Sequence, residues 1–211
     1  MRVELFDFDG TLADSMPYWR QIDIGLFEEF NAPYTIELFQ QLTPLSEEET
    51  AVEFQRHGVD LPVDEIIRRK NDFMEDAYLH KISLKPGALE YMAKVKAEGA
   101  VLAICSSTAE RLLQACTARL GVQQEFRAIY SASELGYSKA DPALYRYICQ
   151  QLGAELEELT FYDDNAEAIQ GAAAAGVHTV GIYDPASAHR WPMLQQSAQR
   201  SIRSFEELLK D

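Results

Sequence analysis

Two aspartates near the start of the chain are the first residues that could do chemistry. Asp7 and Asp9 come at the end of the apolar run Val3–Phe8, and Gly10 then lets the backbone turn sharply and approach a ligand. Two carboxylates at this spacing repel each other unless a cation lies between them, and Mg²⁺ prefers oxygen ligands. A capped acidic turn is the alternative interpretation of so short a pattern.

Two further polar residues follow later apolar runs. Ser106 comes directly after Ala100–Cys105 at a predicted helix start, where its hydroxyl and the next backbone N–H groups could hold a phosphate. An ordinary helix cap is the alternative for this serine. Lys139 lies in a loop before a predicted helix, and its cation could hold both a phosphate and a carboxylate. A surface lysine is the alternative there.

A second pair of acids follows the run Leu159–Tyr162. Asp163 and Asp164 stand before a predicted helix, and two adjacent acids exceed what capping that helix needs. If the apolar runs are parallel strands, all of these side chains lie at the same edge of the sheet. Such convergence favours one site over several unrelated caps.

The elements that must position these residues alternate between strands and helices. Strands are predicted at Val3–Phe8, Ala100–Cys105, Arg127–Ser131, Leu159–Tyr162 and Val177–Ile182, and helices at 86–98, 106–120, 141–153 and 166–175. A short strand and a last helix are predicted within Ser201–Leu209. The alternation indicates an α/β fold with a Rossmann-like parallel sheet covered on both faces.

The stretch between the first two strands is different, because it carries only helical patterns. Helices are predicted from Ser15 to about Phe30, at Thr35–Gln41, from Ser46 to about His57, and from Pro62 onward. We therefore predict an all-helical domain at 15–84, inserted into a catalytic core made of 1–14 and 85–211.

Composition excludes some functions. The chain has 211 residues, 47% of them hydrophobic, which is enough for a core of substantial size. A formal net charge of −15 argues against nucleic-acid binding, which needs a basic surface. Cys105, Cys116 and Cys149 lack metal-site spacing and are expected to be small buried hydrophobes in a reducing compartment. Without a visible signal peptide or membrane-spanning run, we expect a cytoplasmic protein that binds no membrane.

In their order along the chain, these motifs resemble those of the haloacid dehalogenase superfamily of phosphohydrolases. The resemblance rests on Asp7–Ser15, on Ser106 after its strand, on Lys139, and on Phe161–Asn165. The helical insertion is similar to the C1 cap of the branch that contains phosphoglycolate phosphatase and β-phosphoglucomutase. One departure is Ala140, which stands where the family usually has a proline directly after the lysine.

The resemblance implies a role for each motif residue. Asp7 would be the nucleophile that forms an aspartyl-phosphate, and Asp9 would be the acid and base. Phosphate would be bound by Ser106, the Ser107 backbone N–H and Lys139. Mg²⁺ would be held by the carboxylate of Asp7, the backbone carbonyl of Asp9 and Asp164, with Asp163 ligating directly or through water. The substrate would be a small phosphorylated metabolite, and the protein a monomer or weak dimer.

Three alternatives to a phosphatase follow from the same resemblance. Dehalogenases of the superfamily lack the second acid, so Asp9 argues against a halogenated substrate. Sugar phosphomutases of the β-phosphoglucomutase type carry a cap histidine where this chain has Trp19, which argues against that reading. A non-catalytic regulatory member would be expected to have lost one of the strand-end acids. Specificity candidates in the insertion are Tyr18, Trp19, Arg20, Thr43 and Pro44. Trp19 also belongs to the apolar stripe of its predicted helix, which favours core packing for it.

Overall fold

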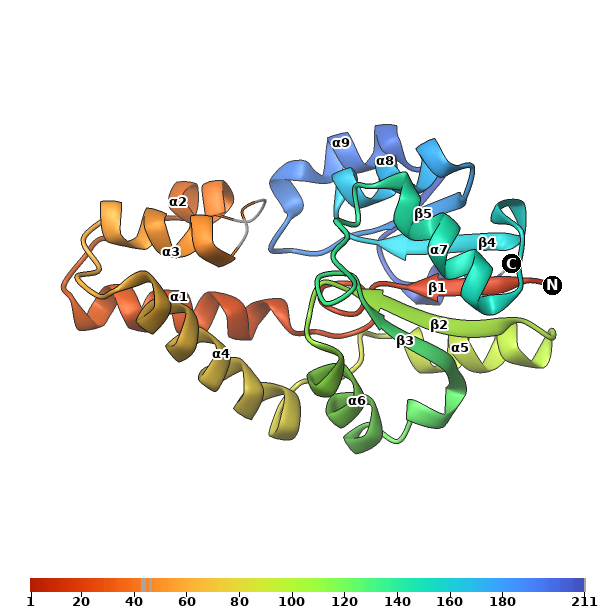
Figure 1. The fold of residues 1–211 in the computed structure, drawn as a ribbon, viewed down its shortest axis with the longest axis horizontal. Coiled ribbons are helices and arrows are strands. Elements are labelled where there is room, and N and C mark those ends of the chain that lie inside the picture. The colour runs from red at the N-terminus through yellow and green to blue at the C-terminus, as the bar shows by residue number, and fades with distance from the viewer. Residues whose placement is uncertain (43–44, 46, 211) are drawn as a thin grey trace. The chain divides into compact units, whose positions relative to one another are not determined.

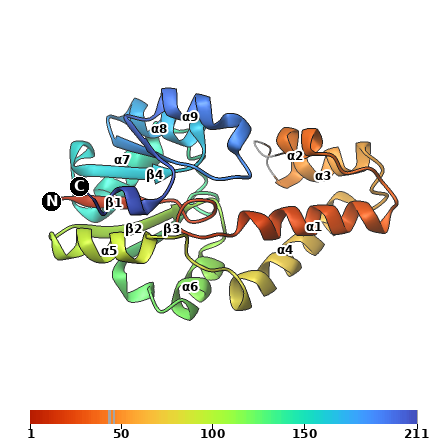
Figure 2. The ribbon, with the colours of Figure 1, turned by 180° about the vertical axis from the view of Figure 1, so that it is seen from behind.

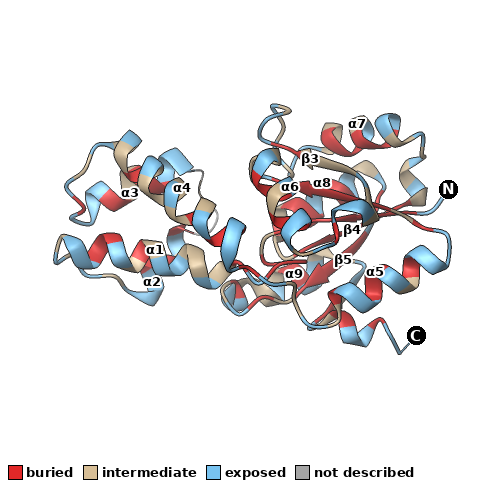
Figure 3. Cartoon of the chain, turned by 90° about the horizontal axis from the view of Figure 1, so that it is seen from below, coloured by how far each residue is buried: buried red, intermediate tan, exposed pale blue. Residues whose placement is uncertain are grey.

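The computed structural model describes residues 1–42, 45 and 47–210. The chain divides into two compact units, one made of Met1–Asp14 with Ile82–Asp211 and the other of Ser15–Lys81. Buried residues run through the interior of each unit, and the outward faces of the helices are exposed (Figure 3). Among the described helices, none combines the length and the apolar character that crossing a bilayer requires.

The boundary between the units differs from the predicted one. The sequence predicts an insertion that continues to residue 84, but residues 82–84 belong to the larger unit. The backbone N–H of Asp14 donates to the carbonyl of Ser83 at 2.9 Å, and Ala13 forms an antiparallel bridge with Leu84. These bonds fasten the returning chain to the outgoing one before the helical part begins.

The larger unit is built on a parallel sheet (Figures 1 and 2). Within the described residues it has six strands in the order β3-β2-β1-β4-β5-β6. They are β1 (Val3–Phe6), β2 (Val101–Ser106), β3 (Phe126–Ser131), β4 (Leu159–Asp163), β5 (His178–Ile182) and β6 (Arg200–Ile202). The chain winds outward from β1 to β3, returns to place β4 beside β1, and continues to β6. This is the strand order of a doubly wound fold, so the predicted α/β Rossmann-like class is confirmed.

Helices cover both faces of the sheet. They are α5 (Ala88–Ala97), α6 (Glu110–Arg119), α7 (Pro142–Leu152), α8 (Ala166–Ala175) and α9 (Trp191–Ser197). In Figure 1, α7, α8 and α9 lie on one side of the sheet, and α5 and α6 lie on the other. Val3 and Leu5 of β1 are fully buried in one cluster with Ile148 of α7 and Ile169 of α8. Burial on both faces explains why the strands are continuous apolar runs.

The first strand ends earlier than predicted. The sequence predicts Val3–Phe8, but β1 stops at Phe6. The carbonyl of Phe8 accepts a hydrogen bond from the N–H of Ala13 at 2.8 Å, which closes a turn in place of a ladder. Asp7 and Asp9 are therefore in the loop that leaves the strand.

Two helices also differ from the prediction. Ser106 and the next two residues were expected to cap a helix, but α6 begins at Glu110 with Ala109 as its N-cap. Ser106 is the last residue of β2, and its hydroxyl accepts a hydrogen bond from the N–H of Thr108 at 3.2 Å. Helix α9 was not predicted, although Pro192 near its start is a common helix-initiating signal. In the predicted tail elements, the strand is β6 and the helix is a short 3₁₀ turn at Phe205–Glu207.

Within its described residues, the smaller unit contains helices joined by loops and turns. Its helices are α1 (Met16–Glu29), α2 (Ile36–Leu42), α3 (Glu47–Arg56) and α4 (Val63–His80). The core contains Phe27 of α1, Phe54 of α3 and Ile66 of α4, all fully buried. A buried ion pair joins Lys70 to Asp23, with 2.7 Å between Nζ and Oδ1. The predicted specificity residues Thr43 and Pro44, and the predicted helix start at Ser46, lie outside the described residues.

Candidate active site

The loop that follows β1 begins beside β4. The backbone N–H of Asp7 donates to the carbonyl of Tyr162 at 2.8 Å, so Asp7 continues the pairing of the two strands by one bond. Gly10 then takes a φ of +76°, a conformation that disfavours other residues. A Cβ at Gly10 would come within 2.8 Å of a carboxylate oxygen of Asp164. The glycine therefore allows both the turn and the close approach of the two loops.

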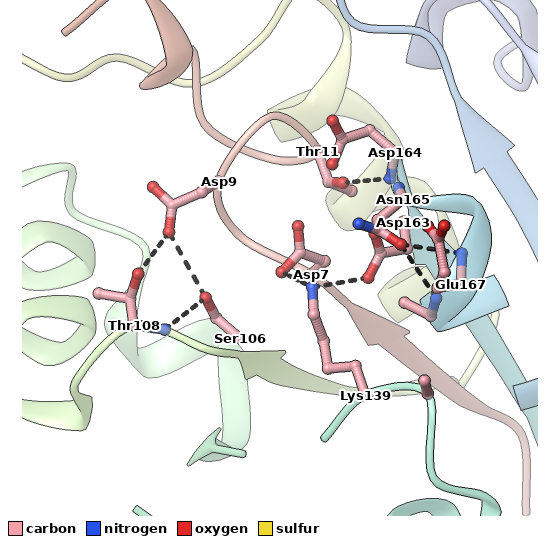
Figure 4. Close-up of polar contacts among 12 residues, drawn as sticks. Asp7, Asp9, Thr11, Ser106, Thr108, Lys139, Asp163, Asp164, Asn165 and Glu167 are labelled. Carbon is pink, nitrogen blue, oxygen red and sulfur yellow. Dashed lines mark hydrogen bonds and ion pairs between the residues drawn. The ribbon is translucent and has the colours of Figure 1, made fainter. Parts of the chain in front are cut away.

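Three aspartates gather where β1 and β4 end (Figure 4). Asp7, Asp163 and Asp164 each offer a carboxylate oxygen, and these oxygens all lie within 4.8 Å of one another. The side chains of Asp7 and Asp163 are almost entirely buried. Asn165 accepts from the N–H of Glu167 at 2.8 Å and so caps α8. The two preceding acids are therefore not the cap of that helix.

Burial and mutual repulsion govern the charge of this cluster. Burial raises the pKa of Asp7 well above its ordinary value, Lys139 opposes that shift, and Asp163 adds to it. Burial is also the main cause that raises the pKa of Asp164 to about 7, and the charge of Asp163 is the next. Three carboxylates held this close favour binding of protons or of a metal ion.

Lys139 is the cation that lies within this cluster. Its Nζ is 2.7 Å from Oδ1 of Asp7 and 2.8 Å from Oδ2 of Asp163. Burial disfavours the charged ammonium, but the two carboxylates outweigh that effect and raise the pKa of Lys139 well above its ordinary value. The lysine therefore stays charged, and it offsets part of the negative charge of the acids.

The loop that carries Lys139 is held by contacts that do not need a proline. The N–H of Ala140 donates to the hydroxyl of Ser138 at 3.2 Å, a bond that a proline at this position could not make. The hydroxyl of Tyr145 lies 2.7 Å from the carbonyl oxygen of Lys139. In α8, Gly171 has no side chain, and a Cβ there would be 2.6 Å from the carbonyl oxygen of Ala140. These contacts hold the Lys139 loop with alanine at position 140.

Replacing Gly171 by alanine should displace the Lys139 loop. The added Cβ would overlap backbone atoms, which yield less easily than a flexible side chain, and such overpacking costs about 1 to 3 kcal/mol. We expect a lower melting temperature and at least about a tenfold fall in kcat, because small misplacements of catalytic groups are costly. Thermal unfolding and steady-state kinetics measure the two effects.

The matched control is Gly25→Ala in α1, where a Cβ would meet, among the described residues beyond its own stretch of helix, no atom within 4 Å. This change should raise stability slightly, because alanine is the better helix former by about 1 kcal/mol. A G171A variant that is also more stable and fully active would contradict the close packing against the Lys139 loop.

The carboxylate of Asp9 is not part of the three-aspartate cluster. Its Oδ2 accepts from the hydroxyl of Thr108 at 2.8 Å and from the hydroxyl of Ser106 at 3.4 Å (Figure 4). That a cation lies between the Asp7 and Asp9 carboxylates stays a prediction, and the three-aspartate cluster does not include the carboxylate of Asp9. The hydroxyl donors on β2 and the loop after it hold Asp9 on the opposite side of its loop from Asp164. Ser107, between these two donors, is exposed.

A second lysine, Lys85, was not predicted as a site residue, and it joins the loop after β1 to the loop after β5. Nζ of Lys85 is 2.6 Å from Oδ2 of Asp184 and 3.2 Å from the carbonyl oxygen of Tyr183, and it also donates to the carbonyl of Gly10. Asp184 is buried and comes two residues after β5. Asp184 follows the fifth predicted strand as Asp9 and Asp163 follow the first and fourth, so the same strand-end rule identifies it.

Thr11 and Thr108 were also missed as site residues. The hydroxyl of Thr11 accepts from the backbone N–H of Asp164 at 3.1 Å, which ties the loop after β1 to the loop after β4. Thr108 contacts Asp9, as described above. Thr11 lies within the Asp7–Ser15 motif, but the spacing of that motif does not reveal its contact with Asp164. Thr108 belongs to no predicted motif, and each contact joins loops that are far apart in the sequence.

Comparison with known proteins identifies the family. The family model described as haloacid dehalogenase-like hydrolase matches residues 5–182, and the chain belongs to this family. The predicted superfamily membership is therefore confirmed, and so is the prediction that the chain is a hydrolase of this type.

Individual relatives agree with the predicted branch. The phosphorylated carbohydrates phosphatase of Thermotoga maritima is 22% identical over 181 residues, 85% of this chain and 84% of the relative. A phosphoglycolate phosphatase of Pseudomonas putida is 26% identical over 187 residues, 86% of this chain and 69% of the relative. A solved structure from Thermotoga maritima that bears the name β-phosphoglucomutase has a TM-score of 0.79 at 21% identity, with 100% of this chain and 97% of that chain covered. The resemblance to the phosphoglycolate phosphatase and β-phosphoglucomutase-like branch is thus confirmed.

Proposed function

We propose that this hydrolase is a Mg²⁺-dependent phosphatase that acts on a small phosphate monoester and becomes phosphorylated on Asp7. The observation that carries the proposal is the division of the acids at the strand ends. Asp7 lies with Lys139 and two more aspartates, whereas the carboxylate of Asp9 is held apart by hydroxyl groups. A nucleophile beside cationic groups, with a separate acid and base, is what phosphoryl transfer to a carboxylate needs.

The residues present fit a magnesium ion. Lys139 pairs with Asp7 and Asp163, and the half-buried Asp164 adds a third carboxylate, so negative charge remains that a divalent cation would offset. We expect Asp7, Asp164 and the backbone carbonyl of Asp9 to hold it. Both oxygens of Asp163 already accept hydrogen bonds, one from Lys139 and one from a backbone N–H, which favours contact through water. When bound, Mg²⁺ would neutralise charge on the phosphoryl group during transfer.

In the first step, a carboxylate oxygen of Asp7 attacks phosphorus in line with the leaving oxygen. The new Asp7–phosphorus bond forms as the bond from phosphorus to the alcohol oxygen breaks, and Asp9 gives its proton to that oxygen. Lys139 favours the ionised form of Asp7 that the attack requires, which opposes the effect of burial. The cation of Lys139 and the hydroxyl of Ser106 would stabilise the equatorial oxygens of the phosphoryl group.

In the second step, water attacks the phosphorus of phosphorylated Asp7. Asp9, now ionised, takes a proton from the water, the Asp7–phosphorus bond breaks, and inorganic phosphate leaves. Asp7 is again a carboxylate and Asp9 is again protonated, so the cycle is complete. Asp9 thus gives a proton in the first step and takes one in the second. A carboxylate bound to the metal ion would be poorly suited to both proton transfers.

For the substrate, we propose a small phosphorylated metabolite, with sugar phosphates as the first class to examine. The names of the relatives support this choice, since one is a phosphatase of phosphorylated carbohydrates and another a phosphoglycolate phosphatase. We assign the smaller helical unit the role of a specificity cap, in keeping with the family resemblance. Trp19, where mutases of this branch carry a histidine, favours hydrolysis over transfer back to the sugar.

The proposal is tested with p-nitrophenyl phosphate and then a panel of sugar phosphates, nucleotides and phosphoglycolate, each with and without Mg²⁺. A phosphatase releases inorganic phosphate in a one-to-one ratio with the alcohol. A mutase returns an isomeric sugar phosphate and needs a bisphosphate primer, which ³¹P NMR would detect. No turnover of any ester under these conditions would favour a regulatory protein that keeps the fold.

Binding of Mg²⁺ should stabilise the protein, and more at high pH than at low pH. A raised pKa means that the fold favours the protonated carboxyl, so stability falls as the pH rises from the unfolded value near 4 toward about 7 for Asp164. The ion relieves this repulsion, and at one hundred times its Kd a ligand adds about 2.7 kcal/mol. We expect the melting temperature in Mg²⁺ to exceed that in EDTA clearly at pH 8 and less at pH 5.5. Equal melting temperatures at pH 8 would contradict a shared metal site.

A further inference from the structure

Thr108 donates a short hydrogen bond to the carboxylate of Asp9. Its Oγ1 lies 2.8 Å from Oδ2 of Asp9, whereas Oγ of Ser106 is 3.4 Å from the same oxygen. The first distance is typical of a good O–H···O bond, and the second is at the outer limit. A third hydrogen bond runs from the N–H of Thr108 to the hydroxyl of Ser106, so Ser106, Thr108 and Asp9 are each bonded to the other two (Figure 4).

The two hydroxyl groups are not equivalent during a reaction. The proposed function requires Ser106 to donate to an oxygen of the phosphoryl group, and a serine hydroxyl has only one proton to give. When that proton turns to the phosphate, Ser106 can no longer donate to Asp9. Thr108 can, and it does not serve as the N-cap of α6, because that position belongs to Ala109.

We infer that Thr108 is a positioning residue for Asp9, an inference that rests on the proposed function. Its hydroxyl holds the carboxylate of Asp9 apart from Asp7, Asp163 and Asp164, so that Asp9 remains available to transfer protons. Asp9 is partly exposed in a loop, and packing alone therefore constrains its side chain less than it constrains the buried acids. The hydrogen bond from Thr108 adds a directional constraint on the carboxylate.

The test is a double-mutant cycle between Thr108 and Asp9. T108V keeps the shape of the side chain and removes its hydroxyl, T108S restores a hydroxyl, and D9N removes the acid. The substrates are p-nitrophenyl phosphate and phenyl phosphate, because phenol is the poorer leaving group and depends more on protonation. Thr117→Val is the matched control, since it removes a buried hydroxyl of α6 that donates to the carbonyl of Leu113.

We expect T108V to lower kcat/KM for phenyl phosphate by about tenfold, and for p-nitrophenyl phosphate by less. T108S should recover most of the loss, T117V should leave both rates unchanged, and T108V should add no further loss in the D9N background. Because the single effects then fail to add, the cycle assigns the role of Thr108 to Asp9.

Other outcomes would overturn the inference. A T108V variant that raises KM alone would make Thr108 a substrate contact, and equal losses in the wild-type and D9N backgrounds would make its effect independent of Asp9. If the wild-type protein turns over no phosphate ester, the proposed function fails and this inference fails with it. An active wild type whose T108V variant is equally active defeats the inference alone.

Discussion

Substituting asparagine for Asp7 should abolish turnover of phosphate esters and leave the fold intact. The amide of asparagine cannot attack phosphorus, and loss of a nucleophile lowers kcat by at least about 10⁴-fold in comparable enzymes. The variant should also fail to form the adduct that beryllofluoride makes with an aspartate nucleophile. Phosphate release assays and ¹⁹F NMR measure the two effects.

The same substitution should not destabilise the protein. Because the pKa of Asp7 is raised in the fold, its ionised form opposes folding at any pH above the ordinary carboxyl value. A neutral amide removes that repulsion, and Lys139 keeps its ion pair with Asp163. At pH 7.5 in EDTA we expect a melting temperature equal to or above that of the wild type. The exposed Asp60→Asn variant serves as the control, and residual activity near the wild-type rate in D7N would rule out covalent catalysis by Asp7.

Replacing Lys139 by methionine should have the largest effect on stability. Methionine fills a similar volume but leaves Asp7 and Asp163 buried without their shared cation. Removing one partner of a buried ion pair costs about 3 to 5 kcal/mol. We expect a steep fall in the melting temperature in EDTA at pH 7.5, together with loss of activity.

This loss should depend on pH and on metal. At pH 5, protonation of the raised-pKa carboxyl groups removes much of the repulsion, so the difference from wild type should shrink. Added Mg²⁺ should restore part of the stability but not the rate. Lys96→Met is the control, because its ion pair with Glu125 is at the surface and such pairs contribute about 0 to 1 kcal/mol. If K139M were no less stable than K96M, the buried ion pairs would have no measurable role.

The strands and the acids at their ends could be predicted because both depend on local sequence. Continuous apolar runs identify strands buried on both faces, and the rule that parallel strands end at one edge then brings Asp7 and Asp163 together. The predicted helix at Ala166–Ala175 has the bounds of α8. No knowledge of tertiary packing was needed for these elements.

The direction in which Asp9 points could not be predicted in the same way. It depends on Thr108, which lies on another strand's loop, so only the folded chain specifies the contact. The function of Gly171 was hidden for the same reason, since a glycine inside a helix gives no sign of which backbone will pass it. The ion pair between Lys85 and Asp184 likewise joins two loops that are distant in sequence. Sequence located the carboxylates, and long-range packing decides which of them act together.

The hydrogen bond between Asp14 and Ser83 has a consequence for how such proteins diversify. It joins the two points where the chain leaves the larger unit and returns to it, so the whole helical excursion begins and ends at neighbouring residues. Because the two ends of the insertion are held together, the insertion is a closed loop on the larger unit. The entropic cost of closing a loop grows only slowly with the length of the loop. The excursion can therefore be lengthened, shortened or exchanged for another without disturbing the strand ends. Given the specificity role proposed for the helical unit, selection for a new substrate could act on that part of the gene and leave the part that encodes the strand ends unchanged.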